Sequence, residues 1–163
     1  MSDQVFTDKR FIKALDCWLA KSDQSCGTTL YQFRTRIPSM FTRVSNVTLY
    51  RGMVVPQDFI DKASTSSGLI LTGFTSWSKD KAIAEKFTTD KSLKTTNNTG
   101  IRILLTLRSS MQFNPIDLES ICLFAGFDMI GNGLDDLSYD SALKEKEVLL
   151  KDVKVTKGMI KKL

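Results

Sequence analysis

Two glutamates, with one residue between them, stand directly before an aliphatic run near the end of the chain. Glu145-Lys146-Glu147 leads into residues 148–150, Val-Leu-Leu, which are typical of a strand. Side chains two residues apart lie on the same face of a strand, so Glu145 and Glu147 are expected to point together and Lys146 toward solvent. Paired carboxylates can divide their roles, because each perturbs the ionisation of the other. Taken alone, such a triplet is more often a solvated strand end.

Two serines share one face of an earlier segment. Residues 74–78, Phe-Thr-Ser-Trp-Ser, alternate in the same way, which places Ser76 and Ser78 on one face and Trp77 on the other. Hydroxyl groups at the end of a strand can hold a ribose or orient a carboxylate. The competing interpretation is a hydroxyl-rich strand end in which Ser78 caps the helix that follows.

An arginine and a phenylalanine complete the set of residues that could bind a ligand. Arg51 follows a β-branched and aromatic segment, and its planar guanidinium matches phosphate oxygens. Gly52 beside it permits a close backbone approach. The competing role for Arg51 is an ion pair with a surface carboxylate. Phe87 either packs in the core or stacks on a heteroaromatic ligand.

Helical patterns precede strand patterns along the chain. Thr7-Asp8 is expected to cap a first helix, which ends before Cys26-Gly27, and a second helix over about residues 28–43 is interrupted at Pro38. Strands are predicted at residues 47–51, 69–78 with a kink near Gly73, 101–107, 148–150 and 153–156, short helices at 57–62 and after 78–80, and loops at 88–100 and 126–141.

This order of elements predicts an α+β fold in one domain. The domain covers residues 1–163, with a helical lead-in over about residues 1–46 and a catalytic β core over about residues 47–163.

The composition removes several kinds of chemistry. The 163 residues include no histidine, which excludes Ser-His and Cys-His nucleophiles, histidine bases and histidine metal ligands. Cys17, Cys26 and Cys122 match no zinc spacing, so we expect reduced thiols and no metal. No apolar run is long enough to span a membrane, and the polar first residues do not predict a signal peptide. A cytoplasmic location is therefore expected.

The three motifs, in this order, resemble the arginine–serine–glutamate class of mono-ADP-ribosyltransferases, which includes bacterial toxins, phage-encoded enzymes and vertebrate ecto-enzymes. The resemblance covers about residues 49–150, and the absence of histidine fits this class. It implies an ADP-ribosyltransferase-like fold, in which two antiparallel β-sheets form a split cleft for NAD behind N-terminal helices. Trp77 departs from the family's Ser-Thr-Ser pattern, whose two serines are present.

The resemblance also implies roles for single residues. Arg51 would hold a phosphate of NAD, the Gly52 backbone would meet the nicotinamide amide, and Phe87 would stack on nicotinamide. Ser76 would orient Glu147, the catalytic carboxylate.

Two further residues belong to the expected site. Ser78 joins Ser76 as a candidate NAD contact. Glu145 would engage the acceptor, and a glutamate at that position favours arginine.

The expected activity is transfer of ADP-ribose from NAD, as co-substrate, to an accessible arginine of a target protein, with release of nicotinamide. The enzyme would act as a phage or bacterial effector on host proteins, without a metal and without a membrane. One alternative is an NAD glycohydrolase, in which water is the acceptor. Transfer to nucleic acid is permitted by the net charge of +5 but is not favoured. A binding module without activity is the non-enzymatic alternative.

Overall fold

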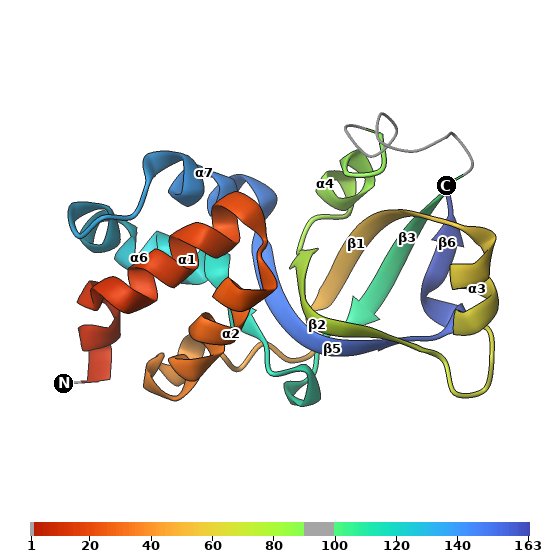
Figure 1. The fold of residues 1–163 in the computed structure, drawn as a ribbon, viewed down its shortest axis with the longest axis horizontal. Coiled ribbons are helices and arrows are strands. Elements are labelled where there is room, and N and C mark those ends of the chain that lie inside the picture. Colours follow the sequence, from red (N-terminus) through yellow and green to blue (C-terminus); the bar gives the residue numbers. More distant parts are fainter. Residues whose placement is uncertain (1, 90–99) are drawn as a thin grey trace.

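The computed structural model describes residues 2–89 and 100–163 (Figure 1). The predicted loop at residues 88–100 lies largely outside the described residues. Within them, helices α1, α2, α6 and α7 gather on one side of the molecule. The sheet, with α3 and α4, forms the other side, and β5 runs from one to the other.

The N-terminal helices α1 and α2 follow one another in the chain and pack together. Helix α1 (Lys9–Lys21) begins after Asp8, whose carboxylate accepts the backbone N–H of Arg10, as predicted. Helix α2 (Gln24–Gln32) contains Cys26-Gly27, so the predicted break there was wrong. A Cβ on Gly27 would lie 2.5 Å from the ring of Phe74, and the glycine therefore lets α2 pack closely against the sheet.

Beyond α2 the chain forms two short 3-10 helices, η2 (Arg34–Arg36) and η3 (Ser39–Phe41). Pro38 lies between them. The helix predicted over about residues 28–43 was wrong beyond Gln32, where α2 ends before the proline is reached.

All strand pairs in the described residues are antiparallel, in the order β4-β5-β2-β1-β3-β6. The strands are β1 (Thr48–Val55), β2 (Leu69–Ser78), β3 (Ile101–Arg108), β4 (Ile116–Asp117), β5 (Glu147–Val155) and β6 (Ile160–Lys162). Strand β1 does not stop at Gly52, and one strand, β5, replaces the two predicted late strands.

One residue pair, Tyr50 with Ser78, joins β1 to β2. The structure therefore holds one six-stranded sheet instead of the two expected sheets, and its two halves diverge from this pair (Figure 1). The predicted kink near Gly73 is confirmed. The register shifts between Leu71 and Phe74, and Gly73 adopts a φ of +87° that favours glycine.

Helices replace the loop predicted at residues 126–141. Helix α6 (Leu118–Gly131) and helix α7 (Asp136–Glu145) fill this segment. The prediction was wrong because Gly126 and Asp135, which indicated a loop, have roles in helices. A Cβ on Gly126 would lie 2.1 Å from the ring of Tyr139, so the glycine allows α6 to pack on α7, and Asp135 caps α7.

Strand β5 separates two hydrophobic cores. Leu149 belongs to the core formed with the N-terminal helices, α6 and α7, whereas Val148 and Leu150 belong to the core on the other face of the sheet. Because side chains alternate along a strand, Glu147 lies on the same face as Leu149. Helices α3 (Gln57–Ala63) and α4 (Lys81–Lys86) complete the sheet side. None of the described helices has the length and apolar character that crossing a membrane requires.

Candidate active site

The Glu-Lys-Glu segment is a turn between a helix and a strand. Glu145 is the last residue of α7, Lys146 takes a left-handed φ of 50°, and Glu147 is the first residue of β5. The expectation that both glutamates lie on one strand was therefore wrong. The exposed Lys146 ammonium lies 3.6 Å from the carboxylate of Asp80.

Glu147 is buried and receives two hydrogen bonds on the same carboxylate oxygen, Oε2. Its side chain is 4% exposed. The Ser76 hydroxyl donates to it at 2.5 Å, and the indole Nε1 of Trp18 donates at 2.8 Å. Ser76 lies on the neighbouring strand β2, while Trp18 comes from α1. A carboxylate held by two donors from different elements has a fixed orientation.

Burial controls the ionisation of Glu147. It raises the pKa of this carboxyl to about 7, against the opposing effects of the bonds from Ser76 and Trp18 and of the Arg51 guanidinium. The nearby Glu145 carboxylate raises the pKa further. Glu147 is therefore poised to change charge near neutral pH.

We expect the carboxyl carbon of Glu147 to titrate with a midpoint near pH 7 in the folded chain. The measurement is a ¹³C NMR titration of glutamate-labelled protein, with the resonance assigned by its loss in Glu147→Gln. A midpoint near 4.5, the ordinary value, would show that the site is more hydrated than its burial implies.

Arg51 lies beside the same carboxylate. Its Nη1 donates to the backbone oxygen of Ser76 at 2.9 Å, and burial lowers its pKa while Glu147 opposes that effect. Its buried Nε has no hydrogen-bond partner among the described residues, and no ion pair in residues 2–89 and 100–163 involves Arg51. In that part of the chain, Arg51 thus does not form the ion pair with a surface carboxylate. An unpartnered guanidinium donor at this position suits an anionic ligand.

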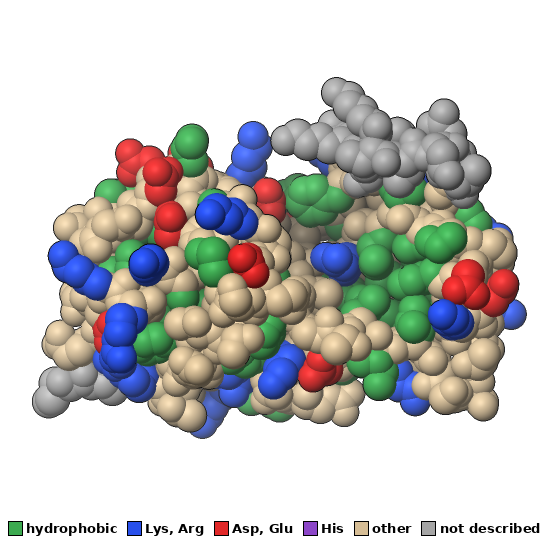
Figure 2. Space-filling model, in the orientation of Figure 1, with side chains coloured by type: hydrophobic (Ala, Val, Ile, Leu, Met, Phe, Trp, Pro, Cys, Tyr) green, Lys and Arg blue, Asp and Glu red, His purple; other side chains and the backbone are tan. Residues whose placement is uncertain are grey.

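One cavity is lined by members of this group, and a second by Glu145 and the end of α4. One of about 190 Å³ is lined by Trp18, Ser22, Gln24, Arg51, Phe74, Thr75 and Ser76. The other, of about 460 Å³, is lined by Ile83, Lys86, Phe87, Lys144 and Glu145. In Figure 2 the surface is hollowed between the helical side and the sheet side of the molecule.

Glu145 and Phe87 share the larger cavity. Burial raises the pKa of the Glu145 carboxyl, and the Ser141 hydroxyl donates to it at 3.3 Å with an opposing effect. The Phe87 ring is 41% exposed, so core packing does not account for it. Phe87 is the residue directly after α4 and forms its C-cap.

Gly52 and Ser78 make contacts with other parts of the chain. A Cβ on Gly52 would lie 1.9 Å from the backbone oxygen of Ala84, so the close approach at this glycine is that of α4. The buried Ser78 donates to the backbone oxygen of Glu145 at 2.8 Å and accepts the N–H of Asp80. Asp80, and not Ser78, caps α4. Ser78 thus ties the end of α7, with Glu145, to strand β2.

Trp18 and Gln24 reach the site from α1 and α2. The sequence predicted these helices as a lead-in without site residues. Gln24 both accepts the N–H of Phe74 at 2.8 Å and donates to its carbonyl at 2.9 Å, thereby replacing a strand partner at the bulge. A signal for Trp18 was present, because an indole on a buried helix face requires an acceptor for its N–H. Trp77, by contrast, is buried in the other core and donates to Thr75.

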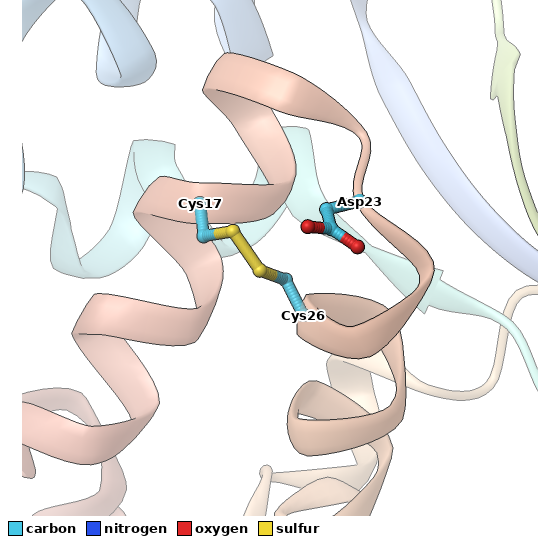
Figure 3. Close-up of side chains that lie close together, drawn as sticks. All are labelled: Cys17, Asp23 and Cys26. Carbon is cyan, nitrogen blue, oxygen red and sulfur yellow. A yellow bond between two sulfur atoms is a disulfide. The ribbon is translucent and has the colours of Figure 1, made fainter.

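A disulfide joins the two helices that carry these residues. Cys17 and Cys26 are bonded, with Cα atoms 5.9 Å apart, so the expectation of reduced thiols was wrong for this pair. The packing of α1 against α2, which spacing along the chain does not reveal, brings them together. The Asp23 carboxylate lies within 4.8 Å of both sulfurs (Figure 3), and Cys122 is a free, buried thiol.

No protein-family model matches the chain, and no curated protein does either. Three solved structures are similar to it. The ADP-ribosyltransferase Vis in complex with agmatine is 19% identical with a TM-score of 0.41, over 93% of this chain and 63% of that chain. Vis in complex with the M6 inhibitor is 20% identical with a TM-score of 0.41, over 93% and 62%. The Vis toxin from Vibrio splendidus is 20% identical with a TM-score of 0.40, over 87% and 57%.

The chain thus spans less than two thirds of the length of these proteins. At such TM-scores the interpretation of the site depends on its own geometry.

Proposed function

We propose that the chain cleaves the bond between nicotinamide and ribose in NAD and transfers ADP-ribose to an arginine of a target protein. The observation that carries the proposal is the group of Glu147, Ser76 and Arg51. The three residues come from separate strands, and each contacts or electrostatically affects another. They are the three residues that the sequence motifs indicated. Acting as a phage or bacterial effector on host proteins is part of this proposal.

The chemistry requires stabilisation of positive charge. Cleavage of the nicotinamide–ribose bond passes through an oxocarbenium-like state, as glycoside cleavage does. An ionised Glu147, held by Ser76 and Trp18, would stabilise that charge where it develops. Arg51 would hold a phosphate of NAD and so position the ribose. Nicotinamide leaves with the bonding electrons, and the acceptor forms the new bond to the ribose carbon.

Glu145 is proposed to bind the acceptor arginine. Its carboxylate lies on the larger cavity and is tied to β2 through Ser78. A carboxylate binds a guanidinium through two hydrogen bonds, and it can accept the proton that the guanidinium must lose. Lys86 and Lys144 line the same cavity and favour an anionic group beside the acceptor, as the diphosphate of NAD supplies.

Replacing Glu145 by Gln should abolish most labelling of proteins while NAD hydrolysis continues. Loss of one partner of a charge pair predicts at least roughly a 30-fold drop in transfer. The measurement incubates the purified chain with labelled NAD and a bacterial or host lysate, and it follows protein bands and free ADP-ribose separately. Asp128→Asn, at an exposed position on α6, is the matched carboxylate-to-amide control. Equal loss of both products would contradict the acceptor role.

The same assay separates the alternative activities. Free ADP-ribose without labelled protein would identify an NAD glycohydrolase. Label that is sensitive to nuclease would identify a nucleic-acid acceptor. An absence of NAD consumption would leave a binding module and would overturn the proposed transfer.

A further inference from the structure

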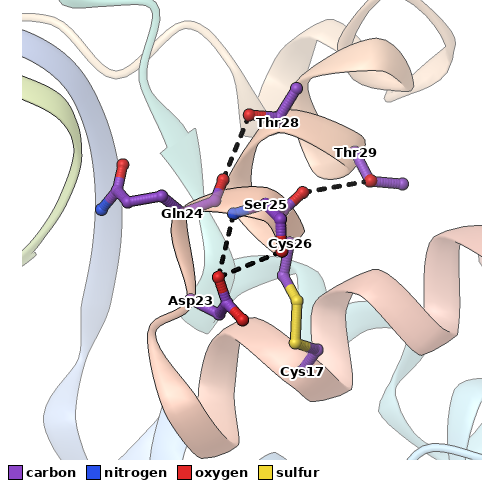
Figure 4. The surroundings of a disulfide bond; sticks show 7 residues. All are labelled: Cys17, Asp23, Gln24, Ser25, Cys26, Thr28 and Thr29. Carbon is purple, nitrogen blue, oxygen red and sulfur yellow. Dashed lines mark hydrogen bonds between the residues drawn. A yellow bond between two sulfur atoms is a disulfide. The ribbon is translucent and has the colours of Figure 1, made fainter.

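The Cys17–Cys26 disulfide lies next to the two helical residues that reach the site. Cys17 immediately precedes Trp18, the donor to Glu147. Cys26 stands two residues after Gln24, which holds the backbone of Phe74. Figure 4 shows the bond, with Gln24 on the side of α2 that is turned away from it. The covalent link therefore restrains both helices at the level of the site.

The disulfide is accessible to small thiols. Both cysteines are partly exposed, and both line a cavity of about 380 Å³. Arg10 and Lys13 line the same cavity, together with Ala14, Ser25 and Thr29. Arg10 is paired with the Asp8 carboxylate at 3.3 Å, whereas Lys13 has no ion pair among the described residues, so Lys13 is the cation that raises the local concentration of an anionic thiol, such as a tripeptide thiol with two carboxylates. The same ammonium also stabilises the thiolate that leaves.

The two sulfurs are not equivalent as leaving groups. Cys26 lies in the first turn of α2, where the helix N-terminus stabilises a thiolate, whereas Cys17 lies in the C-terminal half of α1. The Asp23 carboxylate acts against the thiolate, but it already accepts the N–H and the hydroxyl of Ser25. Cys26 is therefore the better leaving group, and Cys17 the sulfur that is attacked.

We propose that Cys17–Cys26 is a thiol-exchange site through which anionic small thiols switch the Glu147 site off. A thiolate attacks Cys17 Sγ, a new S–S bond forms, and the Cys17–Cys26 bond breaks as Cys26 leaves as a thiolate. A second thiol then attacks the sulfur that the first one contributed. It releases Cys17 as a thiolate and forms the oxidised small-molecule disulfide. Two electrons pass to the protein, and each thiolate takes up a proton according to its pKa.

The consequence for the site follows from the hydrogen bond of Trp18. Once the bond is broken, α1 and α2 stay joined only by the short link Ser22-Asp23 and by packing, and the indole is less firmly positioned. Since the Trp18 bond favours the charged form of Glu147, weakening it raises the pKa of this carboxyl and leaves less carboxylate at neutral pH. This effect on activity depends on the proposed function, whereas the exchange and the movement of Trp18 do not.

The first test observes Trp18 directly, with no substrate. The ¹⁵N–¹H spectrum of the full chain contains two indole N–H resonances, from Trp18 and Trp77, and Trp18→Phe assigns them. Reduction with a phosphine, which leaves no mixed disulfide, should move the Trp18 resonance upfield and leave that of Trp77, bonded to Thr75, in place. Free thiols, counted after unfolding, should rise from one, Cys122, to three. An unchanged Trp18 resonance at three thiols overturns the proposal.

The second test follows NAD cleavage. Reduction should lower the rate at pH 7 by roughly five- to tenfold and move the acid limb of the pH profile upward, as expected for loss of a hydrogen bond to a charged group. Trp18→Phe should show the same drop while oxidised and no further drop when reduced. Cys17→Ser with Cys26→Ser should behave as the reduced chain. Equal rates in both redox states would refute the switch. No cleavage in either state would refute the proposed function, and the Trp18 resonance would then be the test of the switch.

The third test addresses the thiol. Lys13→Gln should slow reduction by glutathione by roughly two- to threefold and leave reduction by uncharged 2-mercaptoethanol unchanged. An equal effect on both thiols, or on neither, contradicts the proposed preference for anionic thiols.

Discussion

Replacing Glu147 by Gln should stop the proposed NAD cleavage and at the same time stabilise the folded chain above pH 7. The loss of activity should be on the order of 10³-fold, because the amide cannot balance the charge that develops on the ribose. The amide oxygen can still accept the bonds from Ser76 and Trp18, so the fold should be kept.

The gain in stability follows from the raised pKa. Glu147 titrates near 4.5 when unfolded and near 7 when folded. The unfolded state thus releases its proton first, and the folded state loses stability as the pH rises from 4.5 through 7. The full difference is about 3 kcal/mol, which Glu147→Gln should recover at pH 8 and not at pH 4.

The measurements for this variant are NAD consumption and urea unfolding at both pH values. Equal stability of the two proteins at pH 8 would show that the ionised Glu147 carboxylate does not destabilise the folded state. Residual cleavage near the wild-type rate would remove Glu147 from the mechanism.

Gly52→Ala should destabilise the chain by roughly 3 kcal/mol. The new Cβ would lie 1.9 Å from the backbone oxygen of Ala84, and backbone cannot yield as the end of a side chain does. Helix α4 must therefore move away from β1, and with it Ile83 and Phe87 on the larger cavity. We expect a lower unfolding midpoint in urea together with a loss of NAD cleavage.

Gly131→Ala is the matched control, since a Cβ there meets nothing within 4 Å. That variant should be neutral or slightly more stable, because alanine restricts the unfolded chain. A neutral Gly52→Ala would show that α4 is not fixed against β1.

The site combines a buried carboxylate that is costly to ionise with an arginine whose Nε lacks a partner among the described residues. Both features disfavour stability, and both are typical of positions kept for chemistry. The Glu147→Gln and Gly52→Ala variants distinguish a residue kept for chemistry from a residue kept for packing. The first removes a group whose ionisation is costly, whereas the second disturbs the packing that holds the cavity in place.

The sequence by itself determined the local elements and the identity of the central group. The capped first helix, the strand that contains Ser76 and the kink at Gly73 follow from residue types and short-range periodicity, which act over a few neighbours. The types and order of Arg51, Ser76 and Glu147 were equally visible, because their chemistry is written in the residues themselves.

The tertiary structure decided how these residues are held. Trp18 and Glu147 are 129 residues apart, and only the tertiary fold, which brings α1 to the start of β5, makes one the donor to the other. Cys17 and Cys26 meet because α1 and α2 pack side by side. Gly27 and Gly126 are residues that typically end a helix, yet each lies inside one. Glycine is required there because a neighbouring ring occupies the space that a Cβ would take. Contacts of this kind depend on which surfaces meet, and residue spacing carries no record of that.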